Sequence, residues 1–487
     1  MAECLTSSGV DIDASTRTYL SPLLSAGASD SQFLNRDFLK ASPADFNGIL
    51  FSTIFANPPY TRRSALQPND TALIDNLRQK IGPLNFGKAS YWAYFLLHSL
   101  SFLQNGGKMI FLLPTSLLQT DYGKNLCNYL GERFEQVNIV VLAFRAFREA
   151  QVSVAILLAL NYGAQPDGVT VSIARNSVEL GGMSNALSRV IPTVATTGFQ
   201  NWRMMFLSSE TLNIYKRLIA GTDIKRFEDI FRVRIGVVTG ANEFFVVSDQ
   251  IAKTLQIPDD QIFPVVSNGH AVRGLTFTKD DYGLLSASSK PSVILRLEEN
   301  ALNSEMRDYI KGGEATGLAS RLKCSIRKPW YTLDDVAEPD AFFQYMKSSA
   351  PHLVLNDSGC TCTNALHRVN FRQTLPRYQK EFIAVSILTS VTQLTMELTG
   401  RSYGGGVLKM EPGTLAKVPL VHLSDVEGVD ETFRICDEYL RKDMKQQAIR
   451  IADEFVLIKG KGIKMTHATA MQNAWKALVT LRLEHRK

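Results

Sequence analysis

The segment that most constrains the fold is Ala56-Asn57-Pro58-Pro59-Tyr60, which directly follows an apolar stretch over residues 50–56. A short apolar stretch of this kind predicts a buried strand. Two consecutive prolines cannot continue a hydrogen-bonded ladder, so the strand has to end there, and their fixed φ keeps the chain extended. The segment therefore directs an amide, a carbonyl and an aromatic ring out of a strand end, where α/β sheets carry their functional groups. The alternative is an ordinary turn after a strand.

The first 160 residues alternate short apolar runs with helical stretches, which is typical of βαβ units. We predict helices over residues 90–103 and 115–134. We predict strands over residues 8–12, 48–56, 108–113, 136–143 and 152–160. The pattern indicates an α/β fold with a doubly wound, Rossmann-like sheet of parallel strands.

The rhythm changes near residue 200, after a stretch rich in Gly, Ser, Thr and Asn. We predict a first domain over residues 1–200 and a mixed α+β domain over residues 201–428. In the second domain we expect a helix over residues 382–397. Its expected strands are residues 231–236, 243–248, 352–355 and 368–371. Residues 429–487 predict two further helices.

Charge is concentrated at the end of the chain. The 487 residues carry a net charge of +6, and residues 440–487 hold 11 Lys and Arg against 4 Asp and Glu. Such a basic end indicates nucleic-acid contact, and a solvated helix face explains it equally well.

The composition also indicates the cellular compartment in which the protein works. The chain contains no run of about 18 uncharged apolar residues and no signal-peptide pattern, so we expect neither a membrane span nor export. The 6 Cys are scattered, which favours a reducing, cytoplasmic setting. Cys360, Cys362 and His367 lack the spacing and the second ligand pair of a zinc site, so we expect no metal.

The residue types after the apolar strand suit one kind of chemistry. The exocyclic amine of adenine is a weak nucleophile because its lone pair is delocalised into the ring. The side-chain oxygen of Asn57 and the carbonyl of Pro58 can accept its two N–H bonds and favour a localised lone pair. Tyr60 can stack on the base, and a methyl sulfonium donor held in line then requires mainly positioning.

With these motifs the chain resembles the γ-type, TaqI-like N6-adenine DNA methyltransferases, whose catalytic motif corresponds to Asn57, Pro58, Pro59 and Tyr60. The resemblance implies S-adenosylmethionine as donor. It also implies that Asp11, in Gly9-Val10-Asp11-Ile12-Asp13, binds the donor's ribose hydroxyls. Asp37, in Asn35-Arg36-Asp37-Phe38-Leu39, would contact the donor's adenine amine, with Phe38 packing nearby.

Two more segments of the first domain extend the resemblance. The segment from Lys88 to Phe95 lies where the family has a helix near the donor, and Ser90 replaces the usual Asp or Asn. Phe147 matches the aromatic residue that stacks on the opposite face of a flipped target base.

The second half resembles the family's target-recognition region, which implies double-stranded DNA as partner. The stretch from Val233 to Phe245 is similar to a recurrent R-x-G-x-x-T-G-x-N-x-x-F pattern, and the segment from Gly400 to Lys409 is similar to a closing segment. The candidates for phosphate or base contact are Arg232, Arg234, Thr239, Asn242, Arg273 and Arg401.

The start of the sequence departs from the family. Family members begin with a strand, a Gly-rich turn and a helix, whereas here the second-strand motif starts at Gly9. We therefore expect the first strand and the Gly-rich donor motif to be missing. The chain would then be truncated, or be completed by a second polypeptide, or fill the gap with another segment such as residues 455–462.

The leading hypothesis is a site-specific adenine-N6 DNA methyltransferase that acts as the modification arm of a restriction or phage-defence system, with a restriction endonuclease as companion. The second is a DNA-binding protein that is catalytically impaired or is one half of a split enzyme. The third is a methyltransferase that acts on protein glutamine or on RNA, where a related Pro-Pro-Tyr motif occurs.

Overall fold

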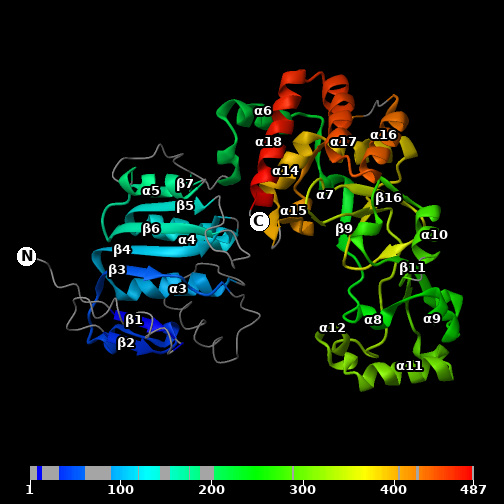
Figure 1. Cartoon of the computed structure of the whole chain (residues 1–487), viewed down its shortest axis with the longest axis horizontal. Coiled ribbons are helices and arrows are strands. Elements are labelled where there is room, and N and C mark those ends of the chain that lie inside the picture. The colour runs from blue at the N-terminus through cyan, green and yellow to red at the C-terminus, as the bar shows by residue number, and fades with distance from the viewer. Residues whose placement is uncertain are drawn as a thin grey trace, which may run out of the picture. The chain divides into compact units, whose positions relative to one another are not determined.

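A computed structural model of the chain describes residues 8–11, 13, 32–60, 89–118, 120–142, 154–174, 176–186, 202–287, 290–403, 406–423 and 427–484. The chain divides into two compact units, Met1–Trp202 and Arg203–Lys487 (Figure 1). The division falls close to residue 200, where the composition of the sequence changes.

The first unit contains a five-stranded sheet of order β3-β4-β6-β5-β7 and a separate two-stranded sheet of β1 and β2. The strands are β1 (Ser8–Asp11), β2 (Gln32–Asn35), β3 (Phe51–Ala56), β4 (Leu103–Pro114), β5 (Phe134–Leu142), β6 (Val154–Tyr162) and β7 (Gly168–Ala174). They include all five predicted strands, and β2 and β7 are additional.

The prediction that the sheet is parallel throughout is wrong. The pairs β1–β2, β3–β4 and β5–β7 are parallel, but β6 runs antiparallel to both β4 and β5. The reason is the connection of residues 143–153, which is too short for the crossover of a dozen or more residues that parallel neighbours need. The sheet is therefore mixed.

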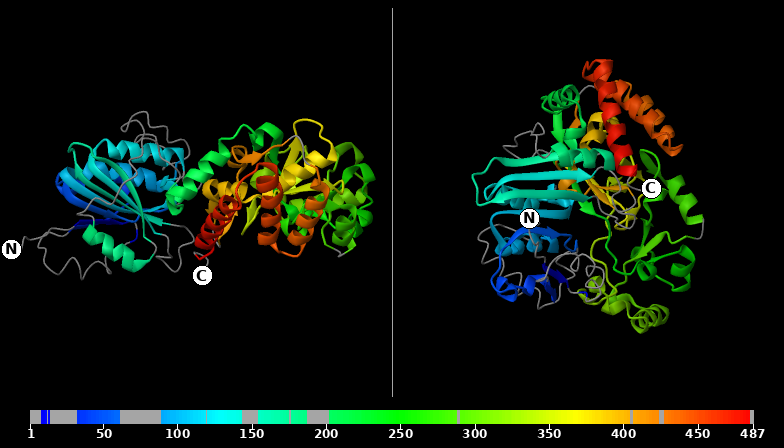
Figure 2. Two further views of the ribbon diagram at one scale, coloured as in Figure 1. Left: turned by 90° about the horizontal axis from the view of Figure 1, so that it is seen from above. Right: turned by 60° about the vertical axis from the view of Figure 1, so that its left-hand side comes forward.

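Helices cover both faces of this sheet. Figure 2 shows α3 (Tyr91–Ser99) and α4 (Asp121–Gly131) on one face and α5 (Ser177–Ala186) on the other. The predicted helix over residues 90–103 ends early, because the 3₁₀ turn η4 (Leu100–Phe102) leads directly into β4. At the start of α4, the Thr120 hydroxyl accepts a hydrogen bond from the Gly123 amide at 3.2 Å, which satisfies one free helix-terminal N–H.

The strands β1, β2 and β3 share one apolar cluster. Buried Phe46, from the 3₁₀ turn η2 (Pro43–Phe46), and buried Phe102 lie at its centre. Val10 of β1, Leu34 of β2 and Ile54 of β3 pack against them.

Among the described strands, β3 pairs only with β4 and so forms one edge of the five-stranded sheet. Its Phe55 is 77% exposed, and Ile49 and Leu50 just before the strand are also exposed. An apolar sheet edge of this kind presents unsatisfied backbone groups that another strand can pair with.

The described residues of the second unit form four sheets. Their orders are β12-β16-β14-β18-β9, β10-β13-β11-β17, β15-β20-β19 and β21-β8. The strands are β8 (Ile224–Arg226), β9 (Phe231–Ile235), β10 (Val246–Val247), β11 (Ile262–Val266), β12 (Thr276–Thr278), β13 (Val293–Leu295), β14 (Ala341–Phe343), β15 (Met346–Lys347), β16 (Leu353–Asp357), β17 (Thr361–Cys362), β18 (His367–Phe371), β19 (Arg401–Tyr403), β20 (Val407–Lys409) and β21 (Pro419–Val421).

The helices of this unit lie around the sheets and form most of its C-terminal part. They are α6 (Ser209–Ile219), α7 (Phe227–Ile230), α8 (Asn242–Phe245), α9 (Asp249–Thr254), α10 (Lys279–Ala287), α11 (Ser304–Ala315), α12 (Leu322–Ser325), α13 (Arg377–Leu388), α14 (Ser390–Thr399), α15 (Pro412–Leu415), α16 (Val429–Arg441), α17 (Lys445–Ala452) and α18 (Met465–Glu484), with a π-helical segment at Asp453–Gly460.

Two predicted elements of the second unit are corrected. Residues 243–248 were expected to form a strand, but the Ala241 carbonyl accepts hydrogen bonds from the Phe244 and Phe245 amides, and the short helix α8 results before β10. The single helix expected over residues 382–397 is two helices, α13 and α14, bent by 59°. At the bend, both the amide and the hydroxyl of Thr389 donate to the Ser386 carbonyl, which diverts the backbone from regular helix.

Within the described residues, no single helix is long and apolar enough to cross a membrane, although α13 and α14 together pass on length and composition.

The basic C-terminal segment belongs to the second unit. Instead of the two helices expected, it forms α16, α17, the π-helical segment and α18. Phe433, Ile449 and Trp475 from this segment are buried in the same core as Phe382 and Leu394 of α13 and α14. These helices therefore have one face in the core.

A buried ionic cluster fixes α18 to α14. The Glu397 carboxylate, 2% exposed, accepts from Arg482 Nε at 2.9 Å and Nη2 at 2.6 Å. Arg203 donates to the carbonyls of Glu397 and Gly400 at 2.6 Å each. Burial lowers the pKa of Arg203 to about 10, with Glu397 opposing and Arg482 adding to the shift. The cluster thus joins residues at the start, middle and end of the unit.

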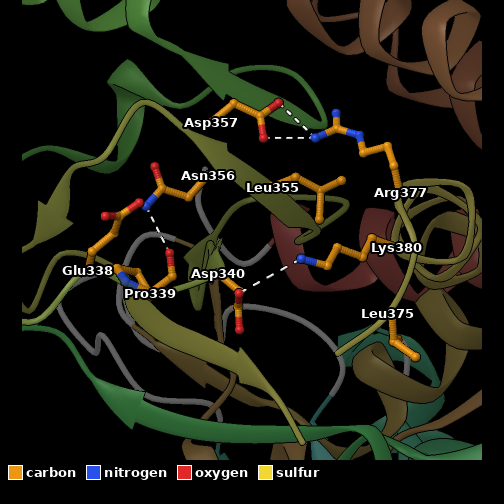
Figure 3. Close-up of a pocket in the computed structure, with 9 residues that line it drawn as sticks. All are labelled: Glu338, Pro339, Asp340, Leu355, Asn356, Asp357, Leu375, Arg377 and Lys380. Atoms are coloured by element: carbon orange, nitrogen blue, oxygen red, sulfur yellow. Dashed lines mark hydrogen bonds and ion pairs between the residues drawn. The ribbon is translucent and has the colours of Figure 1, made fainter. Parts of the chain in front are cut away.

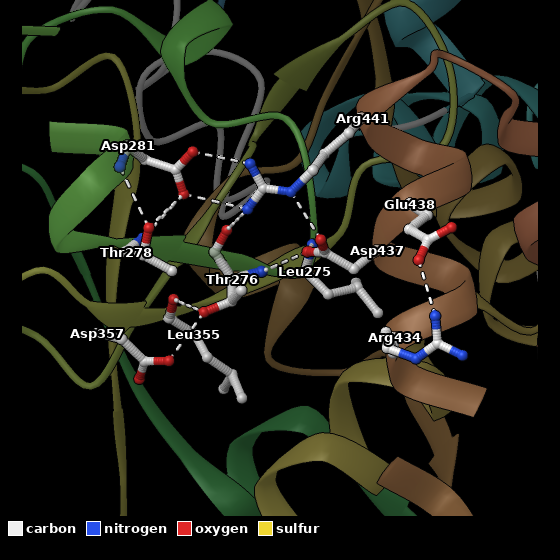
Figure 4. Close-up of polar contacts among 10 residues, drawn as sticks. All are labelled: Leu275, Thr276, Thr278, Asp281, Leu355, Asp357, Arg434, Asp437, Glu438 and Arg441. Carbon is white, nitrogen blue, oxygen red and sulfur yellow. Dashed lines mark hydrogen bonds and ion pairs between the residues drawn. The ribbon is translucent and has the colours of Figure 1, made fainter. Parts of the chain in front are cut away.

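A second ionic group fixes α16 to β12 and α10 (Figure 4). Arg441 donates to Asp437 at 2.6 Å, to Asp281 at 2.8 Å and to the Thr276 carbonyl at 2.8 Å. Burial would raise the pKa of Asp281, but hydrogen bonds from Arg441 and Thr278 outweigh it, so the pKa is lowered. The carboxylate of Asp281 is therefore stabilised in its charged form.

Candidate functional site

The Asn-Pro-Pro-Tyr segment lies at the carboxyl end of β3, as the sequence predicts. Asn57 and Pro59 are exposed, whereas Pro58 is buried and Tyr60 is half-buried. In the parallel pairing of β3 and β4, Ala56 lies opposite Phe111. The segment therefore emerges beside residue 112 of the neighbouring strand.

Tyr60 connects the segment to β4. Its hydroxyl lies 3.1 Å from the Leu112 carbonyl oxygen and 3.1 Å from the side-chain oxygen of Asn57. The ring packs against an apolar cluster that contains Val140 and Val154. Burial raises the pKa of Tyr60 to about 12, so the phenol keeps its proton at neutral pH. A single hydroxyl proton serves one of the two acceptors at a time.

The two predicted donor-binding carboxylates follow neighbouring strands. Asp11 ends β1, and Asp37 lies two residues beyond β2, the parallel partner of β1. The Asp11 carboxylate accepts from the Asp13 amide at 2.9 Å, and the Asp37 carboxylate accepts from the Leu39 amide at 3.1 Å. Each carboxylate is therefore oriented by the backbone that follows it.

Two further residues of the first unit have different surroundings. The ring of Phe38 packs at 5.0 to 5.4 Å from those of Phe95, His98 and Phe102, so it contributes to the core beneath α3. Ser90 precedes α3, and its hydroxyl accepts from Tyr122 at 3.4 Å. Phe147 lies outside the described residues.

The predicted recognition residues of the second unit are mostly exposed. Arg232 and Arg234 alternate with Val233 on β9 and so lie on one face of its sheet. Arg234 lies 3.7 Å from Asp335. Arg273 and Arg401 are exposed on other segments.

Thr239 and Asn242 belong to the loop of residues 236–242, which connects β9 to α8. Thr239 is buried, and its hydroxyl donates to the side-chain oxygen of Asn242 at 2.5 Å and accepts from the Ala241 amide at 3.2 Å. Asn242 itself is exposed at the start of α8. Thr239 thus orders the loop, and direct contact with a ligand stays a prediction for both residues.

Sequence reasoning missed the turn at α12. This turn packs directly on the 236–242 loop and exposes Leu322, Ile326 and several cations. The available signal was the composition of residues 318–330, which contain four Lys or Arg and no Asp or Glu.

A cavity of about 240 Å³ lies elsewhere in the second unit, between β16 and α13 (Figure 3). Four of its five charged groups pair with one another: Arg377 donates to Asp357 at 2.7 Å, and Lys380 lies 3.9 Å from Asp340. The Asn356 amide donates to the Pro339 carbonyl at 2.8 Å. These pairings account for most of the polar lining as part of the fold.

Comparison with known families identifies the class of protein. The family described as "Type II methyltransferase M.Eco57I, C-terminal domain" matches residues 199–457, and the "Eco57I restriction-modification methylase" family matches residues 18–147. The first match alone covers more than half of the chain. The chain therefore belongs to the Eco57I-like family of type II restriction-modification methyltransferases, and the prediction of a restriction-modification methyltransferase is confirmed at this level.

Individual relatives agree with this assignment. The chain is 24% identical over 413 residues to the type II methyltransferase M.AccI of Acinetobacter calcoaceticus, covering 80% of this chain and 73% of the relative. It is 22% identical over 425 residues to M.PaeR7I of Pseudomonas aeruginosa, covering 82% and 68%.

A solved structure supports the fold. The restriction-modification enzyme MmeI in complex with DNA matches 96% of this chain with a TM-score of 0.50 and 12% identity. The chain spans 63% of the length of that protein and 60% of the restriction endonuclease BpuSI, for which the TM-score is 0.37.

Proposed function

We propose that this protein transfers the methyl group of S-adenosylmethionine to the N6 amine of adenine in a specific double-stranded DNA sequence. In this proposal it is a γ-type, TaqI-like enzyme that acts as the modification arm beside a restriction endonuclease. The observation that carries the proposal is the placement of Asn57 and Pro58 at the end of β3, with Tyr60 held to β4 at 3.1 Å.

Asn57 and Pro58 supply the acceptors that an adenine amine requires. The Asn57 side chain is exposed and the Pro58 carbonyl is the next acceptor along the chain. When both accept from the amine, its lone pair is localised on nitrogen and directed at the methyl carbon. The nitrogen–carbon bond would form as the donor's carbon–sulfur bond breaks, which would leave the donor's sulfur as a neutral thioether, and the excess amine proton would leave to water. No strong base is needed, since positioning carries the reaction.

Tyr60 would have two tasks. Its ring would stack on the extruded base, with Phe147 on the opposite face. Its hydroxyl would also orient the Asn57 amide. The Leu112 carbonyl can only accept a hydrogen bond, so the phenol would donate its one proton to Leu112. A half-turn of the amide then lets Asn57 Nδ2 donate to the phenol oxygen, with Oδ1 facing the substrate. Tyr60 is in this respect a positioning residue.

Asp11 and Asp37 fit the adenosine part of the donor. Bound S-adenosylmethionine supplies an electrophilic methyl group. Carboxylates accept hydrogen bonds from ribose hydroxyls and from an adenine amine. Since the two residues follow neighbouring parallel strands, both requirements can be met by one bound molecule.

The exposed edge of β3 supports a proposal about assembly. Phe55 is exposed beside the catalytic segment, and β1 and β2 form a separate sheet that shares an apolar cluster with β3. We propose that a further apolar strand, supplied by a companion polypeptide, pairs with β3.

Exposed cations of the second unit support DNA as the substrate. Arg232, Arg234, Arg273 and Arg401 have exposed side chains, as contacts with phosphates and base edges require. Asn242 would add a polar contact from the 236–242 loop.

The test is methyl incorporation by the purified full chain into unmethylated duplex DNA from labelled donor. Asn57→Ala should lower the turnover about 10²–10³-fold, the range found when one preorganised polar contact to a reacting group is removed. Asn57→Asp, which keeps an acceptor, should retain more activity than Asn57→Ala. Equal incorporation by the wild-type chain and Asn57→Ala would contradict the proposal.

The exposed β3 edge also favours a second candidate, a chain that binds DNA but needs a completing strand for methyl transfer. Calorimetry separates the two, since this second candidate predicts duplex binding without donor binding. Methyl transfer to RNA or to protein glutamine, but never to DNA, would replace both candidates with the third hypothesis.

A further inference from the structure

A helical turn of the second unit exposes two large aliphatic side chains. Leu322 begins α12 and is 77% exposed, and Ile326 just beyond it is 69% exposed. The backbone of Ile326 is still helical, with φ −82° and ψ −11°. Residues four apart on a helix lie on the same side, so the two side chains form one apolar projection.

This projection is surrounded by positive charge. Residues 318–330 include Arg321, Lys323, Arg327 and Lys328 and contain no Asp or Glu. Lys323 and Lys328 are exposed, and Arg321 pairs with Glu243 of α8 at 2.5 Å. A surface of aliphatic groups flanked by cations is complementary to DNA, which offers apolar base surfaces between anionic backbones.

The turn is held firmly to the loop that contains the predicted recognition residues. Arg327 donates to the Val238 carbonyl at 2.8 Å and to the Thr239 carbonyl at 2.5 Å. Cys324 is fully buried, with its sulfur 3.7 Å from the Thr239 carbonyl. Gly240 has a φ of +81°, and a Cβ there would lie 2.7 Å from the Cβ of Lys323.

Aromatic packing between residues 327–330 and α8 also supports the α12 turn. Trp330 packs at 4.7 Å from Phe244 of α8, and the guanidinium of Arg327 lies 5.3 Å from the ring of Phe245. Figure 1 shows α12 and α8 together at one end of the second unit. The exposed aliphatic pair is therefore presented by a rigid support, which lowers the entropy cost of inserting it into a partner.

We infer that Leu322 and Ile326 form an apolar wedge that inserts between base pairs of the duplex, with Lys323 and Lys328 on the adjoining phosphates. The inference rests on the DNA substrate of the proposed function. Wedges of Leu and Ile partly unstack a base step and kink the duplex. The wedge would thus prepare the DNA for extrusion of the target base.

The second unit offers a matched control. Leu284 of α10 is 76% exposed, close to the value for Leu322, but the first turn of α10 carries Asp280 and Asp281, so Leu284 lacks the purely cationic flanks of the α12 turn. The variants to compare are the double variant Leu322→Ala/Ile326→Ala, the double variant Lys323→Ala/Lys328→Ala and the control Leu284→Ala. All affect exposed side chains, so thermal unfolding should match the wild type.

The experiment measures fluorescence anisotropy of a labelled random duplex pool over a salt series, and the emission of 2-aminopurine placed in such duplexes. The aliphatic double variant should bind about tenfold more weakly at every salt concentration, with an unchanged slope of log K against log salt, and should lose the rise in 2-aminopurine emission. The lysine double variant should instead lower the slope by about 1 to 2, since each phosphate contact contributes about 0.9. The Leu284 control should behave as the wild type.

The outcomes separate the wedge from the proposed function. Wild-type binding and methylation with an unaffected aliphatic double variant would overturn the wedge and leave the function intact. Failure of the wild-type chain to bind any duplex would overturn both. If the aliphatic variant kept its DNA affinity and instead lost association with a purified companion endonuclease, the surface would be a protein-docking site and the wedge would be wrong.

Discussion

The two units differ in what they bury and what they expose. The second unit buries charge, and its Glu397 lies in the core paired with Arg482. The first unit leaves Phe55 exposed on β3, next to Asn57 at the predicted catalytic segment. Removing one partner of a buried ion pair strongly destabilises the fold. An exposed apolar sheet edge, in contrast, can pair with a further strand. The buried charges of the second unit therefore have their partners within that unit, whereas among the described residues β3, which leads into the predicted catalytic segment, has one edge without a partner strand.

The largest expected effect comes from breaking the buried ion pair. Glu397→Gln leaves the guanidiniums of Arg482 and Arg203 in the core without this counter-charge, which should cost about 3–5 kcal/mol of unfolding free energy. Chemical denaturation of the full chain measures the loss. The matched control is Glu438→Gln, which breaks the exposed i,i+4 pair of Glu438 with Arg434 (Figure 4) and should cost about 0.5 kcal/mol or less. Equal losses of unfolding free energy in the two variants would show that the pair of Glu397 and Arg482 does not stabilise the second unit more than an exposed ion pair does.

A second consequence of burying charge is a dependence of stability on pH. Burial raises the pKa of Asp453 from 3.8 to about 7, opposed by hydrogen bonds from Gln472 and Ser390. A carboxyl with a raised folded-state pKa contributes its full stability below pH 3.8 and loses it as pH rises towards 7.

The test compares melting temperatures across this pH range for the wild-type chain and Asp453→Asn. The melting temperature of the wild type should fall more steeply between pH 4 and pH 7 than that of the variant. The slopes are compared, because the variant also alters the contact with Gln472. Parallel slopes would contradict the assignment.

A smaller effect is expected from the first unit when the Tyr60 hydroxyl is removed. Tyr60→Phe keeps the ring but loses the bonds to Leu112 and Asn57, so Asn57 is no longer oriented. We expect turnover to fall about tenfold, equivalent to about 1.4 kcal/mol, with donor and DNA affinities unchanged. In the double variant Tyr60→Phe/Asn57→Ala the two effects should not add. An additive result would mean that the hydroxyl acts independently of Asn57.

The smallest effect should come from the open edge itself. Phe55→Ser should change the unfolding free energy of the isolated chain by about 0.5 kcal/mol or less, since the ring is exposed. Phe111→Ala, on the paired strand β4 and fully buried, should cost about 3–5 kcal/mol. A large loss for Phe55→Ser would show that a strand already covers this edge in the isolated chain.

The sequence predicted the elements that local chemistry determines. The end of β3 was predictable because two prolines cannot continue a ladder, and the change of domain was visible in composition. The direction of β6 depends on the length of the preceding connection, which periodicity does not report. The bend at Thr389 depends on the carbonyl to which its hydroxyl donates, and the helical spacing of apolar residues does not reveal that acceptor.

The site was predictable to a similar extent. Asp11, Asp37 and Asn57 occupy strand ends, as their motifs indicate, and Phe147 lies outside the described residues. The contact of Tyr60 with Leu112 joins residues 52 positions apart, and that of Glu397 with Arg482 joins residues 85 positions apart. Such contacts arise from packing. The exposure of Leu322 and Ile326 also depends on the fold, because an apolar side chain in a sequence is more often buried.

The central claim is that the amine of adenine is methylated through Asn57. The most direct measurement incubates the purified chain with unmethylated duplex DNA and a donor carrying a deuterated methyl group, then identifies the labelled nucleoside by mass spectrometry. We expect label on adenine N6 with the wild-type chain and loss of this label with Asn57→Ala. Label on cytosine, or equal adenine labelling by the two proteins, would contradict it.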